Sequence, residues 1–339
     1  MRKQLDKLGR QILTLRDALL VALTSFVAMC YLAPLSQRVT LRLCRNVLPC
    51  ACVLIPTERF MDFLHILILA VVQGAAELLP VSSSAHVIVA EKLMGLDPTS
   101  PQMTLLLVML HTGTMFAVIV YFWQAWRQTY FSSRQAFRSN ALLVLVATAA
   151  TGIIGLTLQH LIKHYYAHNA AGFEIEQLFG NTKLIAAALA AAGVLILISS
   201  RLDHAGRNEL NVPNALWIGA VQGLCLPFRG FSRSGATIST GLVLGVTRRR
   251  AEEFSFALAV VLTPVVVVKE GWRLVSDEAH TAHAVSLSSM IVPAALGMIL
   301  SFLSGLGALR WLSRWLEQGR WYLFGGYCLL ASLVVLQLG

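Results

Sequence analysis

Apolar runs separated by short polar segments fill the chain from Met61 to its end. Six of these runs are long enough to cross a hydrocarbon layer of ~30 Å as helices that rise ~1.5 Å per residue. The six predicted spans are 103–123, 140–162, 180–200, 254–272, 287–309 and 321–338. The pattern therefore predicts an all-α polytopic membrane protein.

Four shorter apolar runs form two pairs, and a polar loop interrupts each pair. The first loop is Leu-Pro-Val-Ser-Ser-Ser at 79–84, and the second is Pro-Phe-Arg-Gly-Phe-Ser-Arg-Ser at 227–234. A Gln-Gly dipeptide precedes each loop, and the two dipeptides lie 149 residues apart. Because a polar loop interrupts each pair, each pair is predicted to be a re-entrant helix hairpin. The paired runs are 62–79 with 86–95, and 214–226 with 235–247.

Three predicted spans follow each hairpin, so the chain contains two copies of one unit, repeat one at 61–200 and repeat two at 214–339. An odd number of crossings gives the copies opposite orientations, as in inverted-repeat transporters. Loop charges support this topology because Lys and Arg concentrate in cytoplasmic loops. The predicted cytoplasmic segments 124–139, 201–213, 248–250 and 310–320 hold 11 Lys and Arg residues, whereas 96–102, 163–179 and 273–286 hold 2.

Residues 1–60 differ from the repeats. Residues 18–35 are apolar and follow five basic residues, which is the arrangement of a signal-anchor helix. Residues 36–60 are polar and basic, and Met61 then begins the first repeat. We expect an N-terminal extension that either carries an extra transmembrane helix or precedes the true start codon at Met61.

Composition narrows the class of protein further. Hydrophobic residues make up 56% of the 339 residues and charged residues only 13%, against roughly 25% charged residues in soluble domains. A soluble enzyme, a nucleic-acid-binding module and a disordered chain are therefore excluded. The net charge of +10 is explained by cytoplasmic loops, so we expect membrane lipids as neighbours and no nucleic acid.

Glu77 and Arg233 are charged residues within the predicted hairpins. Glu77 lies four residues after Gln73, so both side chains lie on one face of a helix. Arg233 belongs to the second loop. A charge at membrane depth costs about 2.5–3.5 kcal/mol on insertion scales, and such residues are functional by default. The alternative is that Glu77 and Arg233 only neutralise each other.

Serines gather in both loops and predict an anion site. Ser82 or Ser83, and Ser232 or Ser234, are placed to cap the helix that follows. Helix N-termini with free N–H groups and hydroxyls attract anions, and the Arg233 guanidinium matches phosphate oxygens. Single serines could be plain caps, but two caps that face each other predict a phosphate site.

His86 follows Ser83 by one helical turn, where an imidazole could take a proton from a serine or water. The alternative is a buried histidine with ordinary hydrogen bonds. Together these residues fit two classes of function. One is a lipid-phosphate hydrolase, and the other is a carrier for an anionic lipid or solute.

Both loops carry motifs that resemble those of the undecaprenyl-diphosphate phosphatase family of the bacitracin-resistance type. Residues 73–86, Gln-Gly-Ala-Ala-Glu-Leu-Leu-Pro-Val-Ser-Ser-Ser-Ala-His, resemble its first signature, and residues 230–237, Gly-Phe-Ser-Arg-Ser-Gly-Ala-Thr, resemble its second. The resemblance covers about 61–339, which would be the phosphatase domain. Arg229 replaces a usual proline, and Ala85 replaces a usual glycine.

The resemblance implies hydrolysis of undecaprenyl diphosphate to undecaprenyl phosphate and phosphate in the bacterial inner membrane. This reaction recycles the lipid carrier for cell-wall synthesis and gives bacitracin resistance. Divalent Mg²⁺ or Ca²⁺ is implied as cofactor, with Glu77 and Gln73 as its ligands. The alternative function is a flippase for a polyprenyl phosphate or other anionic lipid. Catalytic roles are expected for Glu77, Ser83 and His86, and phosphate binding for Arg233, Ser232, Ser234 and Thr237; the attacking group could be Ser83, His86 or water.

Overall fold

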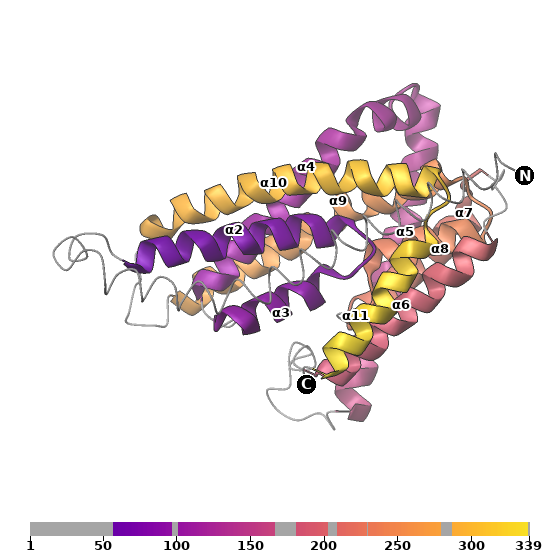
Figure 1. Cartoon of the computed structure of the whole chain (residues 1–339). Helices are drawn as coiled ribbons and strands as arrows, with labels where there is room; N and C mark the ends of the chain where they lie inside the picture. Colours follow the sequence, from indigo (N-terminus) through magenta and orange to yellow (C-terminus); the bar gives the residue numbers. More distant parts are fainter. Residues whose placement is uncertain are drawn as a thin grey trace, which may run out of the picture. The chain divides into compact units, whose positions relative to one another are not determined.

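The structure is a computed structural model that describes residues 57–96, 101–166, 181–202, 209–228, 230–278 and 287–337. The predicted N-terminal helix at 18–35 and the loop residue Arg229 lie outside the described residues. All regular elements in the described ranges are helices (Figure 1). They are α2 (Thr57–Leu78), α3 (Ser83–Met94), α4 (Pro101–Tyr130), α5 (Arg134–Leu161), the π-helix η1 (Ile162–Tyr166), α6 (Thr182–Leu202), α7 (Val212–Cys225), α8 (Arg233–Val243), α9 (Arg248–Glu278), α10 (Leu287–Glu317) and α11 (Tyr322–Gln337).

Five of the described helices are long and apolar enough to cross a membrane, and they lie within α4, α5 with η1, α6, α9 and α10. The sixth predicted span, 321–338, falls on α11, which the structure describes over Tyr322–Gln337 and which is not among these five. Helix α11 has 16 residues and would reach only about 24 Å at ~1.5 Å per residue. It therefore belongs with the short apolar helices, as does the part of α2 at Phe63–Leu78.

The order of the helices follows the predicted order of the two units. Short helices α2 and α3 precede α4, α5 and α6, and short helices α7 and α8 precede α9, α10 and α11. Helix α8 begins as predicted, because the Ser232 side chain accepts a hydrogen bond from the Gly235 N–H at 3.2 Å. The first break differs in its backbone. Ser82 has φ of 65°, the one positive φ of a non-glycine residue in the described chain.

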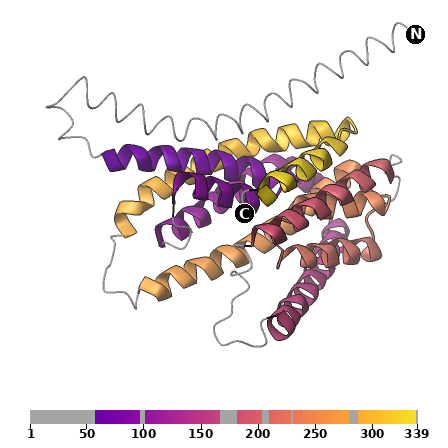
Figure 2. The same cartoon turned by 60° about the horizontal axis from the view of Figure 1, so that its bottom comes forward.

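Helices of one unit pack on helices of the other (Figures 1 and 2). A Cβ atom at Gly74 in α2 would lie 2.6 Å from the Ser301 carbonyl oxygen in α10. In the corresponding place of the second unit, a Cβ atom at Gly223 in α7 would lie 2.9 Å from the Thr151 carbonyl oxygen in α5. Glycine is needed at both positions because the backbones approach closely, as in other packed membrane helices.

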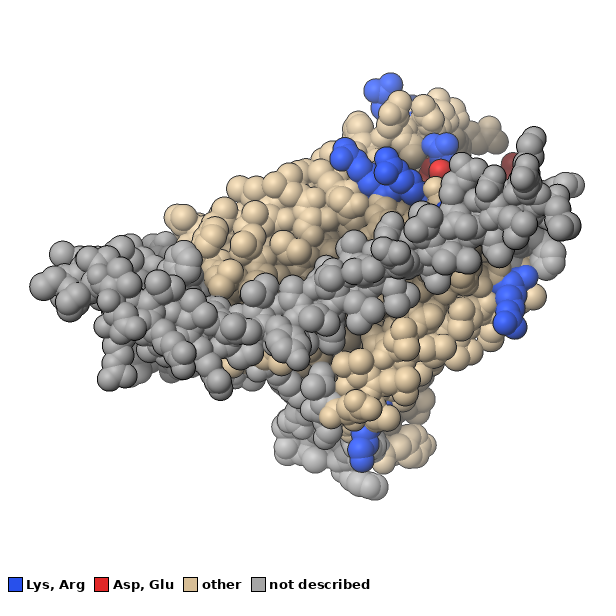
Figure 3. All heavy atoms as spheres, in the orientation of Figure 1, with Lys and Arg blue, Asp and Glu red and all other residues tan. Residues whose placement is uncertain are grey.

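The outer surface of the helices is apolar. The side chains of Leu145, Leu156, Val268 and Val292, for example, are 66%, 68%, 68% and 74% exposed. Figure 3 shows, on its visible face, broad areas without Lys, Arg, Asp or Glu, with most of the basic side chains gathered in one region of the view. Helices that are apolar on their exposed side suit a lipid environment, in agreement with a multi-pass membrane protein.

Candidate active site

Glu77 is the centre of a polar cluster near the C-terminal end of α2. The Gln73 amide donates a hydrogen bond to the Glu77 Oε2 atom at 3.2 Å, as expected for side chains four residues apart on a helix. The Ser83 hydroxyl, at the start of α3, donates to the same oxygen at 2.5 Å. The turn at Pro80 therefore brings the carboxylate and the hydroxyl of the first motif together.

Arg233 joins this cluster from the second unit. Its Nη2 atom lies 2.8 Å from the Glu77 Oε1 atom. The Arg233 and Glu77 side chains are 21% and 17% exposed, so the pair is largely shielded from solvent. This shielding strengthens the interaction between the two charges. Glu77 and Arg233 thus pair with each other, but not exclusively, because Ser83 and Gln73 bind the same carboxylate.

His111 is a further member that the sequence reasoning missed. Its Nδ1 atom lies 2.8 Å from the Leu107 carbonyl oxygen, so Nδ1 carries the hydrogen. Its Nε2 atom lies 3.8 Å from the Glu77 Oε2 atom. The available signal was position, because His111 stands in the middle of the apolar run 103–123, where an ionisable residue marks function.

A cavity of about 210 Å³ adjoins this cluster. Side chains from both units line it, including the carboxylate, the guanidinium and the hydroxyls predicted from the motifs. Its polar lining consists of Glu77, Ser82, Ser83, His111, Ser232, Arg233, Ser234 and Thr263. Hydrogen-bond donors and one arginine around a shared space can bind and stabilise a phosphoryl group.

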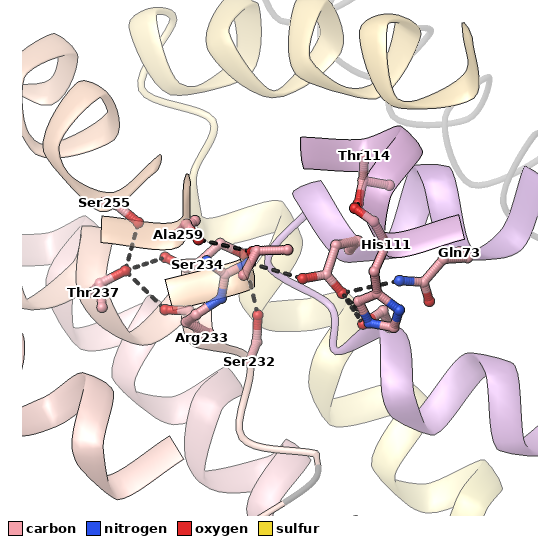
Figure 4. A network of polar contacts seen from close by, with 12 residues as sticks. Gln73, His111, Thr114, Ser232, Arg233, Ser234, Thr237, Ser255 and Ala259 are labelled. Carbon is pink, nitrogen blue, oxygen red and sulfur yellow. Dashed lines mark hydrogen bonds and ion pairs between the residues drawn. The ribbon is translucent and has the colours of Figure 1, made fainter. Parts of the chain in front are cut away.

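Ser232 and Ser234 lie at the wall of this cavity, whereas Thr237 does not. The Ser234 hydroxyl donates to the Leu79 carbonyl oxygen at 3.2 Å, which connects the two motif loops. The Thr237 hydroxyl lies 2.8 Å from the Arg233 carbonyl oxygen and 2.6 Å from the Ser255 hydroxyl of α9 (Figure 4). Thr237 thus supports the first turn of α8, and Ser255 is a second residue that the sequence reasoning missed.

His86 points elsewhere. Its ring nitrogens lie 2.7 Å from the Ser82 carbonyl oxygen and 2.6 Å from the Tyr327 hydroxyl in α11. The imidazole is outside the lining of the polar cavity. The predicted group of Glu77, Ser83 and Arg233 is therefore brought together, and His86 lies on the other side of the Ser82 backbone.

An apolar cavity of about 280 Å³ shares Phe228 and Phe231 with the polar cavity. The rest of its lining is Leu184, Ala188, Ala191 and Leu224. Gly230 lets the loop between these two phenylalanines cross α6 closely. Its φ is 117°, and a Cβ atom there would lie 2.6 Å from the Ile185 carbonyl oxygen.

The side-chain oxygens of Glu77 and Gln73 are too few to hold a divalent cation alone, but they could do so together with a substrate phosphate. In the described residues no group of three His, Cys, Asp or Glu side chains could hold a metal ion. Mg²⁺, however, keeps several waters and commonly uses one or two carboxylates together with substrate phosphates. The Glu77 carboxylate supplies one such ligand, and the Gln73 amide beside it could supply a second oxygen.

Known proteins are similar in sequence to most of this chain. The family model described as bacitracin resistance protein BacA matches residues 66–334, which include both loops. Undecaprenyl-diphosphatase 2 of Acinetobacter baylyi is 65% identical over 280 residues, or 82% of this chain and 98% of that protein. The undecaprenyl-diphosphatases of Desulfosudis oleivorans and Halothermothrix orenii are 33% and 31% identical, over 82% and 81% of this chain and 99% and 98% of theirs.

Proposed function

The chain belongs to the bacitracin resistance protein BacA family, and we propose that it hydrolyses undecaprenyl diphosphate to undecaprenyl phosphate and inorganic phosphate. Recycling of the lipid carrier would sustain cell-wall synthesis and confer bacitracin resistance. The observation that carries this proposal is the Ser83 hydroxyl 2.5 Å from Glu77 and beside Arg233. A carrier needs no proton acceptor next to a serine, so the flippase alternative is not favoured.

The diphosphate would bind between the two loops. The Arg233 guanidinium, with the Ser232 and Ser234 hydroxyls at the N-terminus of α8, would contact the phosphate oxygens. Placing these groups in a shielded cavity raises the strength of each charge interaction. Thr237 would hold the α8 turn in place, given its bonds to the Arg233 carbonyl oxygen and to Ser255.

Attack would occur at the terminal phosphorus. Either the Ser83 oxygen or a water beside it forms the new P–O bond, and its proton passes to the Glu77 carboxylate. The bond from this phosphorus to the bridging oxygen breaks, and undecaprenyl phosphate leaves. With serine as the attacking group, water then hydrolyses the phosphoserine and releases inorganic phosphate.

A divalent cation, Mg²⁺ or Ca²⁺, would be held by Glu77 and Gln73 with the diphosphate. When bound, it would neutralise the negative charge of the phosphate oxygens.

The prenyl chain of the substrate is attached directly to the diphosphate. It therefore needs an apolar surface next to the polar cavity that holds the diphosphate. The cavity that shares Phe228 and Phe231 offers this surface.

We further propose the inverted-repeat topology, with both hairpins re-entrant in the bacterial inner membrane. The packing of α2 on α10 and of α7 on α5 supports it, because equivalent glycines make equivalent contacts across the units. Single cysteines placed at 131–133, between α4 and α5, and at 279–286, between α9 and α10, test it through their accessibility from each side of oriented vesicles. Labelling of these two equivalent connections from the same side would contradict the inverted topology.

Phosphate release from undecaprenyl diphosphate by the purified, detergent-solubilised protein tests the function. We expect release with Mg²⁺ or Ca²⁺, none after chelation, and none from Glu77→Gln at unchanged folding. Reconstituted vesicles provide the comparison with the carrier. Transport of a labelled polyprenyl phosphate without any phosphate release would overturn the hydrolase proposal.

A further inference from the structure

Two residues of α11 hold the first motif loop from outside the polar cavity. The Cys328 thiol donates to the Pro80 carbonyl oxygen at 3.1 Å. The Tyr327 hydroxyl lies 2.6 Å from the His86 Nε2 atom, and the His86 Nδ1 atom lies 2.7 Å from the Ser82 carbonyl oxygen. Cys328 thus binds the residue before Val81 directly, and its neighbour Tyr327 is linked through His86 to the residue after Val81.

The partners of His86 define its tautomer. A carbonyl oxygen can only accept, so the Nδ1 atom carries the hydrogen that bonds the Ser82 carbonyl oxygen. In the neutral ring Nε2 is then an acceptor, and the Tyr327 hydroxyl donates to it. The two rings also stack, with centroids 5.7 Å apart and planes 15° from parallel. Both nitrogens are thereby engaged with protein groups rather than with the cavity.

The backbone at Ser82 needs such support. Its φ of 65° is in the left-handed region, where a non-glycine residue costs about 1–3 kcal/mol and persists only when its surroundings fix it. Ser82 immediately precedes Ser83, whose hydroxyl lies 2.5 Å from Glu77. A change of the Ser82 torsion would turn the first residue of α3 and move this hydroxyl away from the carboxylate.

We propose that Tyr327 and His86 are positioning residues for Ser83. Tyr327 fixes the tautomer and orientation of His86, and His86 holds the Ser82 carbonyl oxygen and thereby the left-handed turn. In this role His86 transfers no proton during the reaction. The proposal rests on the proposed hydrolase function and assigns a task to two residues that lie outside the cavity.

Replacement of His86 by asparagine or by glutamine distinguishes a positioning role from a role in proton transfer. The side-chain nitrogen of asparagine can take the place of Nδ1, so His86→Asn keeps the bond to Ser82 but loses acid–base chemistry. We expect its kcat within about tenfold of the wild type, with KM unchanged. His86→Gln places its amide near Tyr327 instead, and we expect it to lose at least about 100-fold in kcat, as His86→Ala should. Inactivity of His86→Asn in a folded protein with an active wild type would overturn the proposal.

A double-mutant cycle tests the role of Tyr327. Tyr327→Phe removes one hydrogen bond, so we expect kcat to fall by about 5- to 10-fold. In the His86→Asn background the same change should have no further effect, because the imidazole is gone. Tyr322→Phe, at an exposed position of the same helix, is the matched control. Equal effects of Tyr327→Phe in both backgrounds would overturn the link through His86.

A spectroscopic measurement makes the test independent of turnover. ¹⁵N NMR of histidine-labelled protein should show, apart from the signal of His111, a neutral histidine with the hydrogen on Nδ1. This signal should disappear in His86→Asn and lose its fixed tautomer in Tyr327→Phe. The opposite tautomer, or no response to Tyr327→Phe, would contradict the proposal even if the wild type released no phosphate. An inactive wild type with the expected tautomer would instead count against the hydrolase function alone.

Discussion

The Arg233 guanidinium donates to the Glu77 carboxylate at 2.8 Å, although the two residues are 156 positions apart in the chain. This contact joins the first turn of α8 to the last turn of α2. The first repeat supplies the carboxylate and the second repeat supplies the guanidinium, so each charge is balanced by a residue of the other repeat. Removal of one member leaves the other as an uncompensated, largely buried charge, which is strongly unfavourable.

Arg233→Lys should therefore impair catalysis although it preserves the charge. Lysine lacks the planar fork that can contact a carboxylate and a phosphate together. We expect kcat/KM for undecaprenyl diphosphate to fall at least about 100-fold, the loss of about 3 kcal/mol of charge-assisted hydrogen bonds. Steady-state phosphate release measures this.

Arg249→Lys is the matched control for that change. The Arg249 side chain is 69% exposed and pairs with Glu253 on its own helix. Lysine keeps the charge at this exposed side chain, and Glu253 has a second cationic partner in Arg250, so the activity of this variant should equal that of the wild type. If Arg233→Lys were as active as Arg249→Lys, Arg233 would not bind the phosphate through its fork.

Gly230→Ala should distort the second loop. The new Cβ atom would lie 2.6 Å from the Ile185 carbonyl oxygen, at a φ of 117° that disfavours any side chain. We expect the free energy of unfolding to fall by about 1–3 kcal/mol and phosphate release to be lost. Thermal unfolding in detergent and the activity assay measure the two effects.

Gly307→Ala offers the contrast within α10. A Cβ atom at Gly307 would have nothing within 4 Å, and alanine favours a helix by about 0.5–1 kcal/mol over glycine. This variant should be at least as stable as the wild type and fully active. Equal behaviour of both alanine variants would contradict the close approach of the loop to α6.

Gln73→Glu should change the dependence on metal. The Gln73 amide donates to Glu77 at 3.2 Å, and a second carboxylate there would repel the first unless a cation lies between them. We expect the Mg²⁺ or Ca²⁺ concentration for half-maximal activity to fall about tenfold, because a second charged ligand strengthens binding. Without metal, the variant should unfold at a lower temperature than the wild type. A metal titration with no shift would remove Gln73 and Glu77 from the cation site.

Ala191→Trp should impair binding of the prenyl chain. Ala191 lines the apolar cavity next to the phosphate site. Filling it should raise KM for undecaprenyl diphosphate about 4- to 50-fold, the loss of one to three buried methylenes at about 0.8 kcal/mol each, with kcat unchanged. Ala187→Trp, at an exposed position of α6 outside this lining, is the control. Equal KM values for the two tryptophan variants would place the chain elsewhere.

The local features of this protein follow from its amino-acid sequence alone. Runs of apolar residues depend only on composition along the chain, so they predicted the order of the helices and the two interrupted pairs. The spacing of Gln73 and Glu77 and the cap at Ser232 follow from helix geometry, and the structure confirms both. The predicted lengths were less accurate than the order: the run 321–338 corresponds to α11, which has 16 described residues.

Which side chains face the cavity depends on how the helices pack against one another. His86 and His111 each have Nδ1 next to the carbonyl oxygen four residues earlier, yet the Nε2 atom of His86 meets Tyr327 and that of His111 faces Glu77. Thr237 likewise turned to Ser255 rather than to the cavity. The physical reason is that a side chain's partners depend on how its helix is rotated and what packs against it, and those contacts come from residues far away in the chain.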